Sequence, residues 1–359
     1  MRRLTVAAAA AGLLAAGGAA HAQQQPAPVV RVNAMEITLG GRVHMQLNTS
    51  SAEGVPTGEL LLRRVGLGVL LKVNEAVSGT IAADFGGERA AVVDAFMRVA
   101  VAPRLEVFAG RAHRPFSRLT MTSSNRILPI ERGLRIRGVA GLDQNALVSS
   151  LRYADRDVGV QVAGSLPGLP GAPAVRAGVF RGPLHGAVGP RDTYQLVARV
   201  TASASDKLKL GAAWSGRDFS QREVAGADTT FSLRGGSALE IDAEWGTFAP
   251  GLHVIAEASR GDADPHRGTR FTGAQGWLAY RTRELTPTLS GLEAVLRCSW
   301  SEVTGGAGPG IARGGTLLTP GVNVYLGGLN RFMLNYDHWI PQGGGGPAGS
   351  AKAMFSLVF

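Results

Sequence analysis

The sequence predicts an all-β fold: a transmembrane antiparallel β-barrel of about 16 strands, with one long loop folded inward as a constriction. This prediction depends on three observations. The first residues have the pattern of a secretory signal peptide, and short segments of alternating apolar and polar residues recur along the rest of the chain. The last segment also alternates and ends on Phe359.

The N-terminal segment has the three parts of a secretory signal peptide. Arg2 and Arg3 supply positive charge, an apolar run follows from Leu4 to Ala20, and Ala20-His21-Ala22 offers small residues at a cleavage site. A membrane anchor is the alternative, but the run is rich in Ala and Gly and glutamines follow at once. We therefore predict a signal peptide over 1–22, a short periplasmic lead over 23–35 and the barrel over 36–359.

The last nine residues alternate as a strand does. Ala353, Phe355, Leu357 and Phe359 fall on one face, because successive side chains of a strand point to opposite sides. An ordinary hydrophobic tail is the alternative. A final strand that ends on Phe is similar to the last strand of bacterial outer-membrane proteins, where this residue belongs to the assembly signal. We therefore expect the barrel-assembly machinery to act on Phe359.

Composition argues against several classes of protein. Hydrophobic residues make up 45% of the chain, yet no segment after residue 22 holds about 18 uninterrupted apolar residues, so membrane-spanning helices are not expected. Cys298 is the only cysteine, which excludes an internal disulfide framework and a cysteine-based metal site. It alternates with Leu296 and Trp300, so we expect it on an outward apolar face. The net charge of +10 suits anionic partners, but no nucleic-acid-binding motif is present.

Alternation with a period of two marks the candidate strands. In one example Leu239, Ile241, Ala243 and Trp245 alternate with Glu240, Asp242 and Glu244. A soluble sandwich would show the same pattern, and the export signal favours the barrel. Bacterial barrels have an even number of strands, so sixteen is the preferred count and eighteen the alternative. The eighteen candidates are 36–47, 60–73, 76–85, 92–102, 104–113, 134–140, 143–153, 157–165, 174–181, 192–202, 206–215, 237–248, 251–260, 270–282, 289–301, 316–326, 329–339 and 350–359.

The segment Arg98–Arg137 carries a strong excess of positive charge. It holds nine arginines against Glu106 and Glu131. The part from Arg114 to Gly133 is too long for a turn, and its apolar residues argue against disorder. We interpret it as a loop folded against the inner wall, where it narrows the pore.

Arginines of this segment are the candidate residues of an ion pathway. A charged side chain in a narrow pore attracts ions of opposite sign, and the planar fork of Arg donates two hydrogen bonds to a phosphate-like anion. The alternative is that part of them lie at the membrane edges and bind lipid headgroups. The candidates are Arg98, Arg111, Arg114, Arg118, Arg126 and Arg132.

A series of motifs resembles the phosphate-selective porin O and P family over about residues 36–137 and 316–359. The family implies a 16-stranded barrel, usually a trimer, with an inward-folded third outer loop and a basic lumen. Its phosphate-selective members use lysines with an arginine ladder, whereas this chain has four lysines, so the resemblance supports the pore and not phosphate specificity. The motifs are Arg63-Arg64-Val65, Thr80 to Phe85, Val93 to Phe96, Leu105 to Arg111, Arg114-Pro115-Phe116, Thr122-Ser123-Ser124, Ile130-Glu131-Arg132, Thr319 to Leu326 and Arg331 to Tyr336.

We therefore expect a porin of the bacterial outer membrane, for passive diffusion of small hydrophilic solutes with a preference for anions. No enzyme activity, metal or cofactor is expected, because neither a G-x-S-x-G motif nor a Cys/His cluster is present. The expected partners are outer-membrane lipid and lipopolysaccharide, small anions in transit and further copies in a homotrimer, and not nucleic acid. The alternatives are a structural or adhesive barrel with an occluded lumen, or a barrel hydrolase.

Overall fold

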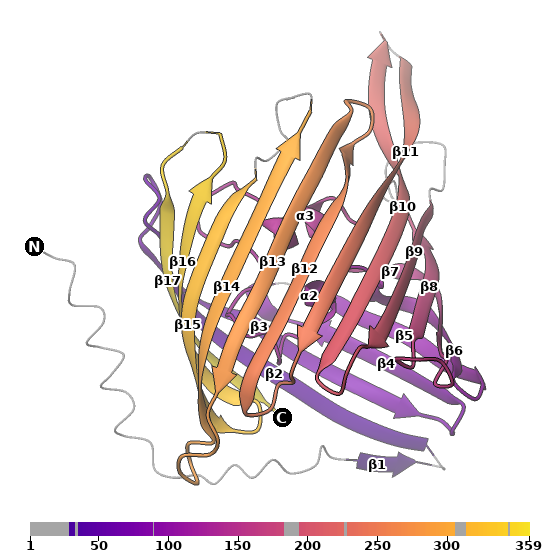
Figure 1. The fold of residues 1–359 in the computed structure, drawn as a ribbon, viewed down its shortest axis with the longest axis vertical. Coiled ribbons are helices and arrows are strands. Elements are labelled where there is room, and N and C mark those ends of the chain that lie inside the picture. The colour runs from indigo at the N-terminus through magenta and orange to yellow at the C-terminus, as the bar shows by residue number, and fades with distance from the viewer. Residues whose placement is uncertain are drawn as a thin grey trace, which may run out of the picture.

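Sixteen antiparallel strands, β2 to β17, form a closed barrel in the computed structural model of the chain (Figure 1). Each strand pairs with the next along the chain, and β17 pairs with β2 to close the ring. A further strand, β1 (Val29–Val32), pairs with the start of β2 outside this ring. The structure describes residues 29–32, 35–88, 90–182, 194–225, 228–305, 314–343 and 345–359, so the expected signal peptide lies outside the described residues.

The strands differ in length around the ring. β10 and β11 have 18 residues each, whereas β4 and β8 have 8 each. In the described part of the chain, no helix is long and apolar enough to span a membrane. The bounds are β2 (Met35–Thr49), β3 (Gly58–Lys72), β4 (Val77–Asp84), β5 (Ala91–Ala102), β6 (Leu105–His113), β7 (Arg156–Ser165), β8 (Ala174–Arg181), β9 (Tyr194–Ser203), β10 (Leu208–Ala225), β11 (Asp228–Trp245), β12 (Gly251–Asp264), β13 (Thr269–Arg281), β14 (Gly291–Thr304), β15 (Gly315–Gly327), β16 (Asn330–Pro341) and β17 (Ala348–Val358).

Side chains alternate between an apolar outer face and a mostly polar inner face. On β11 the outward Leu239 and Ile241 are 61% and 64% exposed, while the inward Glu240 is 1% exposed. This is the pattern of a barrel whose outer face meets lipid. Cys298 is exposed on β14, as its alternation predicts.

Two candidate strands, 134–140 and 143–153, were wrong. They belong to the connection 114–155 between β6 and β7, which contains the short helices α2 (Arg118–Met121) and α3 (Gln144–Ser150). The side chain of Asp143 caps α3 by accepting a hydrogen bond from the backbone N–H of Ala146, as N-cap residues do. Without these two segments sixteen strands remain, which is the count that the sequence favoured.

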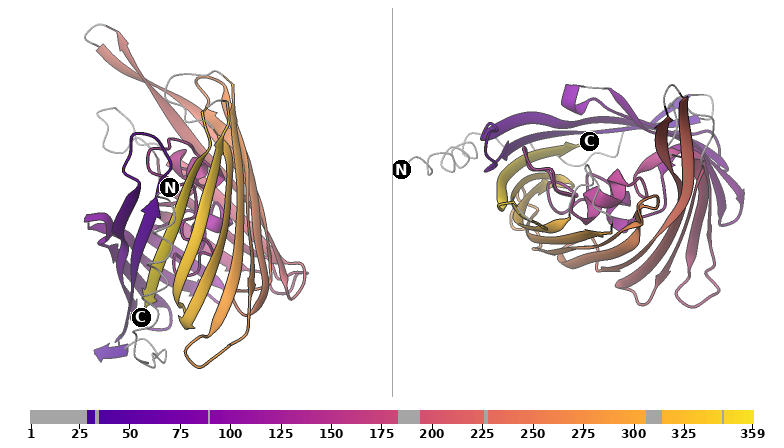
Figure 2. Two further views of the ribbon diagram at one scale, coloured as in Figure 1. Left: turned by 90° about the vertical axis from the view of Figure 1, so that its left-hand side faces the viewer. Right: turned by 90° about the horizontal axis from the view of Figure 1, so that it is seen from above.

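The connection 114–155 lies within the ring of strands, seen from above in Figure 2. Its apolar side chains pack against inward-facing residues of the second half of the barrel. Phe116 and Val148 share one buried cluster with Phe271, and Leu119 and Leu128 share another with residues of β12 to β14. The hydrophobic core therefore lies between this loop and one wall, because a barrel ring this wide leaves its centre to be filled.

Phe359 closes the barrel against Gly41 of β2. Its N–H donates to the carbonyl oxygen of Gly41 at 3.1 Å, and the N–H of Gly41 donates to the carbonyl oxygen of Phe359 at 2.8 Å. Its ring covers Gly41 so closely that a Cβ at this position would lie 2.4 Å from a ring carbon. The glycine therefore makes room for the aromatic ring at the seam.

Replacing Phe359 by Ser should lower the amount of folded barrel in the outer membrane several-fold, because the seam loses its aromatic contact and the expected assembly signal. The heat-modifiable gel mobility of isolated outer membranes measures this amount. Leu357→Ser is the matched control, because Leu357 is also exposed on β17. Equal loss in both variants would contradict a special role for Phe359.

Candidate functional site

The first helical turn of the loop is bound to β11 and β12 by carboxylates. Glu257 accepts hydrogen bonds from the hydroxyl of Ser117 at 2.9 Å and from the N–H of Leu119 at 2.9 Å. Arg118 donates from Nη2 to Glu244 at 2.7 Å. Polar groups buried against a wall need such partners, so the loop has a fixed position there.

The middle of the loop is bound through its backbone to β14 and β16. Nη1 of Arg297 donates to the carbonyl oxygen of Glu131 at 2.7 Å, and the N–H of Ile130 donates to Oδ1 of Asn335 at 2.5 Å. Nη2 of Arg331 donates to the carbonyl oxygen of Ile127 at 2.6 Å. These bonds hold the chain on both sides of Glu131 independently of the Glu131 side chain.

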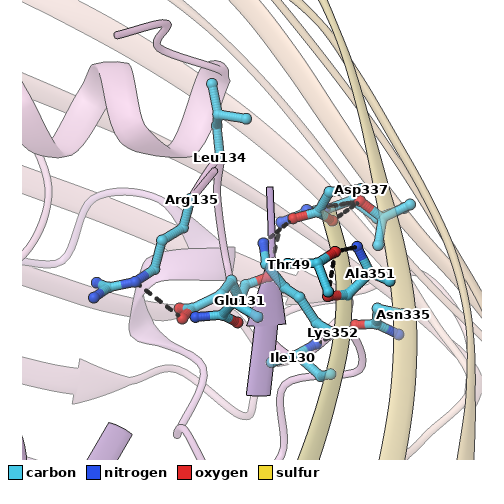
Figure 3. A network of polar contacts seen from close by, with 12 residues as sticks. Thr49, Ile130, Glu131, Leu134, Arg135, Asn335, Asp337, Ala351 and Lys352 are labelled. Carbon is cyan, nitrogen blue, oxygen red and sulfur yellow. Dashed lines mark hydrogen bonds and ion pairs between the residues drawn. The ribbon is translucent and has the colours of Figure 1, made fainter. Parts of the chain in front are cut away.

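A buried group of three charges supports this attachment. Asp337 lies between Arg297, whose Nη2 is 2.8 Å from its Oδ1, and Lys352, which forms an ion pair with its other oxygen. All three side chains are at most 1% exposed. Figure 3 shows Asp337 and Lys352 beside the loop residues Ile130 and Glu131. Nε and Nη2 of Arg297 donate to Thr319 and Asp337, so that Nη1 is left for the loop backbone.

A basic hollow of about 400 Å³ lies on the other side of the loop, toward β3 and β7. Five arginines and two carboxylates belong to its lining, which leaves a formal excess of three positive charges. We call this the basic hollow. Its charged residues are Arg63, Arg64, Glu131, Arg132, Arg135, Asp155 and Arg156.

A β-bulge explains how two consecutive residues of β3 reach the same hollow. Side chains at successive strand positions normally point to opposite faces. The pairing of β2 with β3 shifts register here, since His44 lies opposite Arg64 and Met45 opposite Leu62, with Arg63 as the extra residue. A bulge redirects side chains, and in this case it brings both guanidinium groups inward.

Glu131 occupies the fork of Arg63. Nε and Nη2 of Arg63 donate to the two carboxylate oxygens at 2.6 and 2.9 Å. Gln46 donates to the same carboxylate at 3.2 Å, and Arg135 reaches it at 3.6 Å. Burial by itself would raise the pKa of Glu131, but Arg63, Lys352 and Arg135 together outweigh burial and lower this pKa to about 2. Glu131 is therefore ionised at neutral pH.

Arg132 has no carboxylate partner among the described residues. Nη2 donates to Oγ of Ser124 at 3.2 Å and to the carbonyl oxygen of Thr122. Burial and the charges of Arg64 and Arg156 lower the pKa of Arg132 to about 9, so it stays charged at neutral pH. A charged donor set of this kind has capacity left for an anion.

Two other arginines of the hollow are partly neutralised by aspartates that do not belong to its lining. Arg64 lies 3.7 Å from Asp84, and Nε of Arg156 donates to Asp94 at 2.8 Å. The two aspartates do not line the hollow. In the part of the chain that the structure describes, no group of His, Cys, Asp and Glu is placed to hold a metal ion.

Of the six arginines proposed from the sequence, only Arg132 lines the basic hollow. Arg114 is 4% exposed, and its Nη1 and Nη2 donate to Asp157, Gln195 and the carbonyl oxygen of Ala154. It therefore fixes the loop where it leaves β6. Arg118 is used for the attachment to Glu244 described above.

The remaining candidates lie apart from the hollow. Arg98 forms an ion pair with Glu106 on the neighbouring strand. Arg111 lies opposite Val158, which is 44% exposed on the outer face, and cross-strand partners share a face. Arg126 is exposed, with its guanidinium 5.8 Å from the ring centre of Phe248.

Four arginines of the hollow were missed as candidates, and one of them, Arg135, was counted only as part of the arginine-rich segment. Arg63 and Arg64 stood only within a family motif, although two consecutive arginines in an apolar strand are a signal for a bulge. Arg156 was not singled out, because it begins β7 well beyond the arginine-rich segment. Proximity in the barrel, and not proximity in sequence, brings these residues together.

The sequence model of the phosphate-selective porin O and P family matches residues 37–258. The chain belongs to this family. The match covers more than half of the sequence, including the loop and the basic hollow. No curated protein matches the chain. The protein is thus an outer-membrane porin, and the bacterial outer membrane is its location.

Solved structures of outer-membrane proteins share the fold at low sequence identity. OmpT of Vibrio cholerae has a TM-score of 0.58 at 14% identity, over 93% of this chain and 100% of that chain. An anion-selective porin from Comamonas acidovorans has a TM-score of 0.58 at 13% identity, over 90% and 100%. OmpF of Salmonella typhi in complex with daunomycin has a TM-score of 0.62 at 10% identity, over 92% and 100%. At such identities the likeness shows the barrel fold alone.

Proposed function

We propose that this porin prefers small anions and that they pass through the basic hollow beside the loop. The observation that carries the proposal is the lining of the hollow, where five guanidinium groups face two carboxylates. Fixed charges in a narrow space raise the local concentration of ions of the opposite sign. On its other side the loop packs apolar side chains against the barrel wall.

Phosphate-like anions are the solute class that suits this chemistry best. Each guanidinium offers parallel N–H donors that match two oxygens of a phosphate or a carboxylate. The hollow presents such groups from two sides, since Arg64 and Arg156 come from strands and Arg132 comes from the loop. The Comamonas acidovorans protein that shares the fold is an anion-selective porin, which supports the same direction.

The reversal potential of the purified porin in a planar bilayer tests this proposal. In a potassium chloride gradient the potential should have the sign of chloride permeation, and phosphate added to both sides should reduce the chloride current. A potential with the sign of potassium permeation would contradict the proposal. A barrel that inserts but passes no current would favour the structural or adhesive alternative.

We propose further that the porin forms a homotrimer in contact with outer-membrane lipid, and that it carries no hydrolytic activity. One similar structure of Vibrio cholerae OmpT is a trimer form, which supports the trimer. Family membership supports a channel in place of an enzyme. Cross-linking in isolated outer membranes tests the first point, and release of fatty acid from phospholipid vesicles tests the second.

A further inference from the structure

Glu131 is an acidic residue in the middle of a surface that otherwise attracts anions. It is 6% exposed and lines the basic hollow together with five arginines. Its two oxygens take the paired donors of Arg63 at 2.6 and 2.9 Å. This side-by-side geometry is the one that a phosphate or a carboxylate solute would adopt on the same fork.

Contacts other than this ion pair also hold the backbone at Glu131. Its carbonyl oxygen is held by Arg297. The N–H of Ile130 is held by Asn335, and Figure 3 shows these two residues beside Glu131. Arg135 extends toward the carboxylate from the same loop in this view. Other groups therefore fix the loop backbone, so the ion pair between Glu131 and Arg63 can have a role other than holding the loop.

We propose that Glu131 determines how strongly the hollow holds an anion, because its carboxylate occupies the arginine fork that a passing anion would otherwise bind. This inference rests on the proposed anion preference and adds a specificity-determining residue to it. With Glu131 in place the hollow has an excess of three positive charges, and a solute meets Arg64, Arg132 and Arg156 without gaining the full fork of Arg63. The hollow then attracts anions without binding them tightly, as their passage through the pore requires.

Replacing Glu131 by Gln tests the inference. The variant removes one negative charge and frees one donor pair of Arg63, so phosphate should block the chloride current at a concentration roughly tenfold lower than in the unaltered porin. Glu75→Gln is the matched control: Glu75 also forms an ion pair, with Lys72, but its side chain is 92% exposed in a turn far from the hollow. The control should leave the phosphate block unchanged.

A double-mutant cycle assigns the effect to the fork of Arg63. Adding Arg63→Gln to Glu131→Gln should return the half-blocking phosphate concentration to near that of the unaltered porin. An unchanged or weaker block in Glu131→Gln would overturn the inference, provided that the variant inserts. If that variant does not insert, Glu131→Asp replaces it: a shorter carboxylate loses one of the two contacts, so a two- to threefold tighter block is expected, and an unchanged block overturns the inference.

The same experiments separate this inference from the proposed function. If the unaltered porin shows no anion preference, the proposed function fails whatever the variants do. If the unaltered porin prefers anions and the phosphate block does not respond to Glu131, the inference alone fails.

Discussion

Replacing Arg64 and Arg132 together by Gln is expected to abolish most of the anion preference, so that the reversal potential in a salt gradient falls to near zero. The formal excess of charge in the basic hollow would drop from three to one. Both residues belong to its lining, and Arg132 forms no ion pair among the described residues. Charges in a narrow, poorly screened space have the largest effect on passing ions.

The matched control removes two arginines that lie elsewhere. Arg267 and Arg270 are 44% and 58% exposed near the β12–β13 connection, where they reach Asp264 and Asp262. Arg267→Gln with Arg270→Gln lowers the net charge of the protein equally, but should change the reversal potential little, because solvent screens exposed charges. If both double variants shift the reversal potential equally, the net charge of the protein determines ion selectivity, and the charge of the basic hollow does not.

The barrel and the loop could be predicted because their signals are local. Alternation is read directly along each strand, and the loop between β6 and β7 is marked by length, charge and apolar content within one segment. Helix α3 was assigned to a strand because its apolar residues alone do not distinguish the two. The helix is held by the barrel interior, where Gln144 contacts Ser299 and Ser259.

The roles of single arginines could not be predicted because their partners are distant in sequence. Arg114 and Arg118 lie in the same basic segment, yet each has a carboxylate or amide partner on a strand far along the chain. A paired arginine fixes the loop, whereas Arg132 has no carboxylate partner among the described residues. The sequence shows the excess of positive charge but not which charges the barrel neutralises.

Replacing Asp337 by Ala is expected to lower the free energy of unfolding by about 3–5 kcal/mol, because it leaves Arg297 and Lys352 as buried cations without a counter-charge. Asp337, Arg297 and Lys352 are all at most 1% exposed. Denaturant titration of the detergent-solubilised barrel measures the loss. Glu75→Ala removes an exposed ion pair at 2.6 Å from Lys72 and should cost at most about 1 kcal/mol.

The same variant should also affect conduction. Arg297 holds the carbonyl oxygen of Glu131, so a displaced Arg297 weakens the attachment of the loop and the single-channel current should become noisier. Replacing Arg297, Asp337 and Lys352 together by apolar residues should restore much of the stability, because no buried charge is then left unpaired. The triple variant should not restore the low noise of the single-channel current, because the contact from Arg297 to the loop is still missing. Equal stability of the single and triple variants would show that packing, and not uncompensated charge, causes the loss.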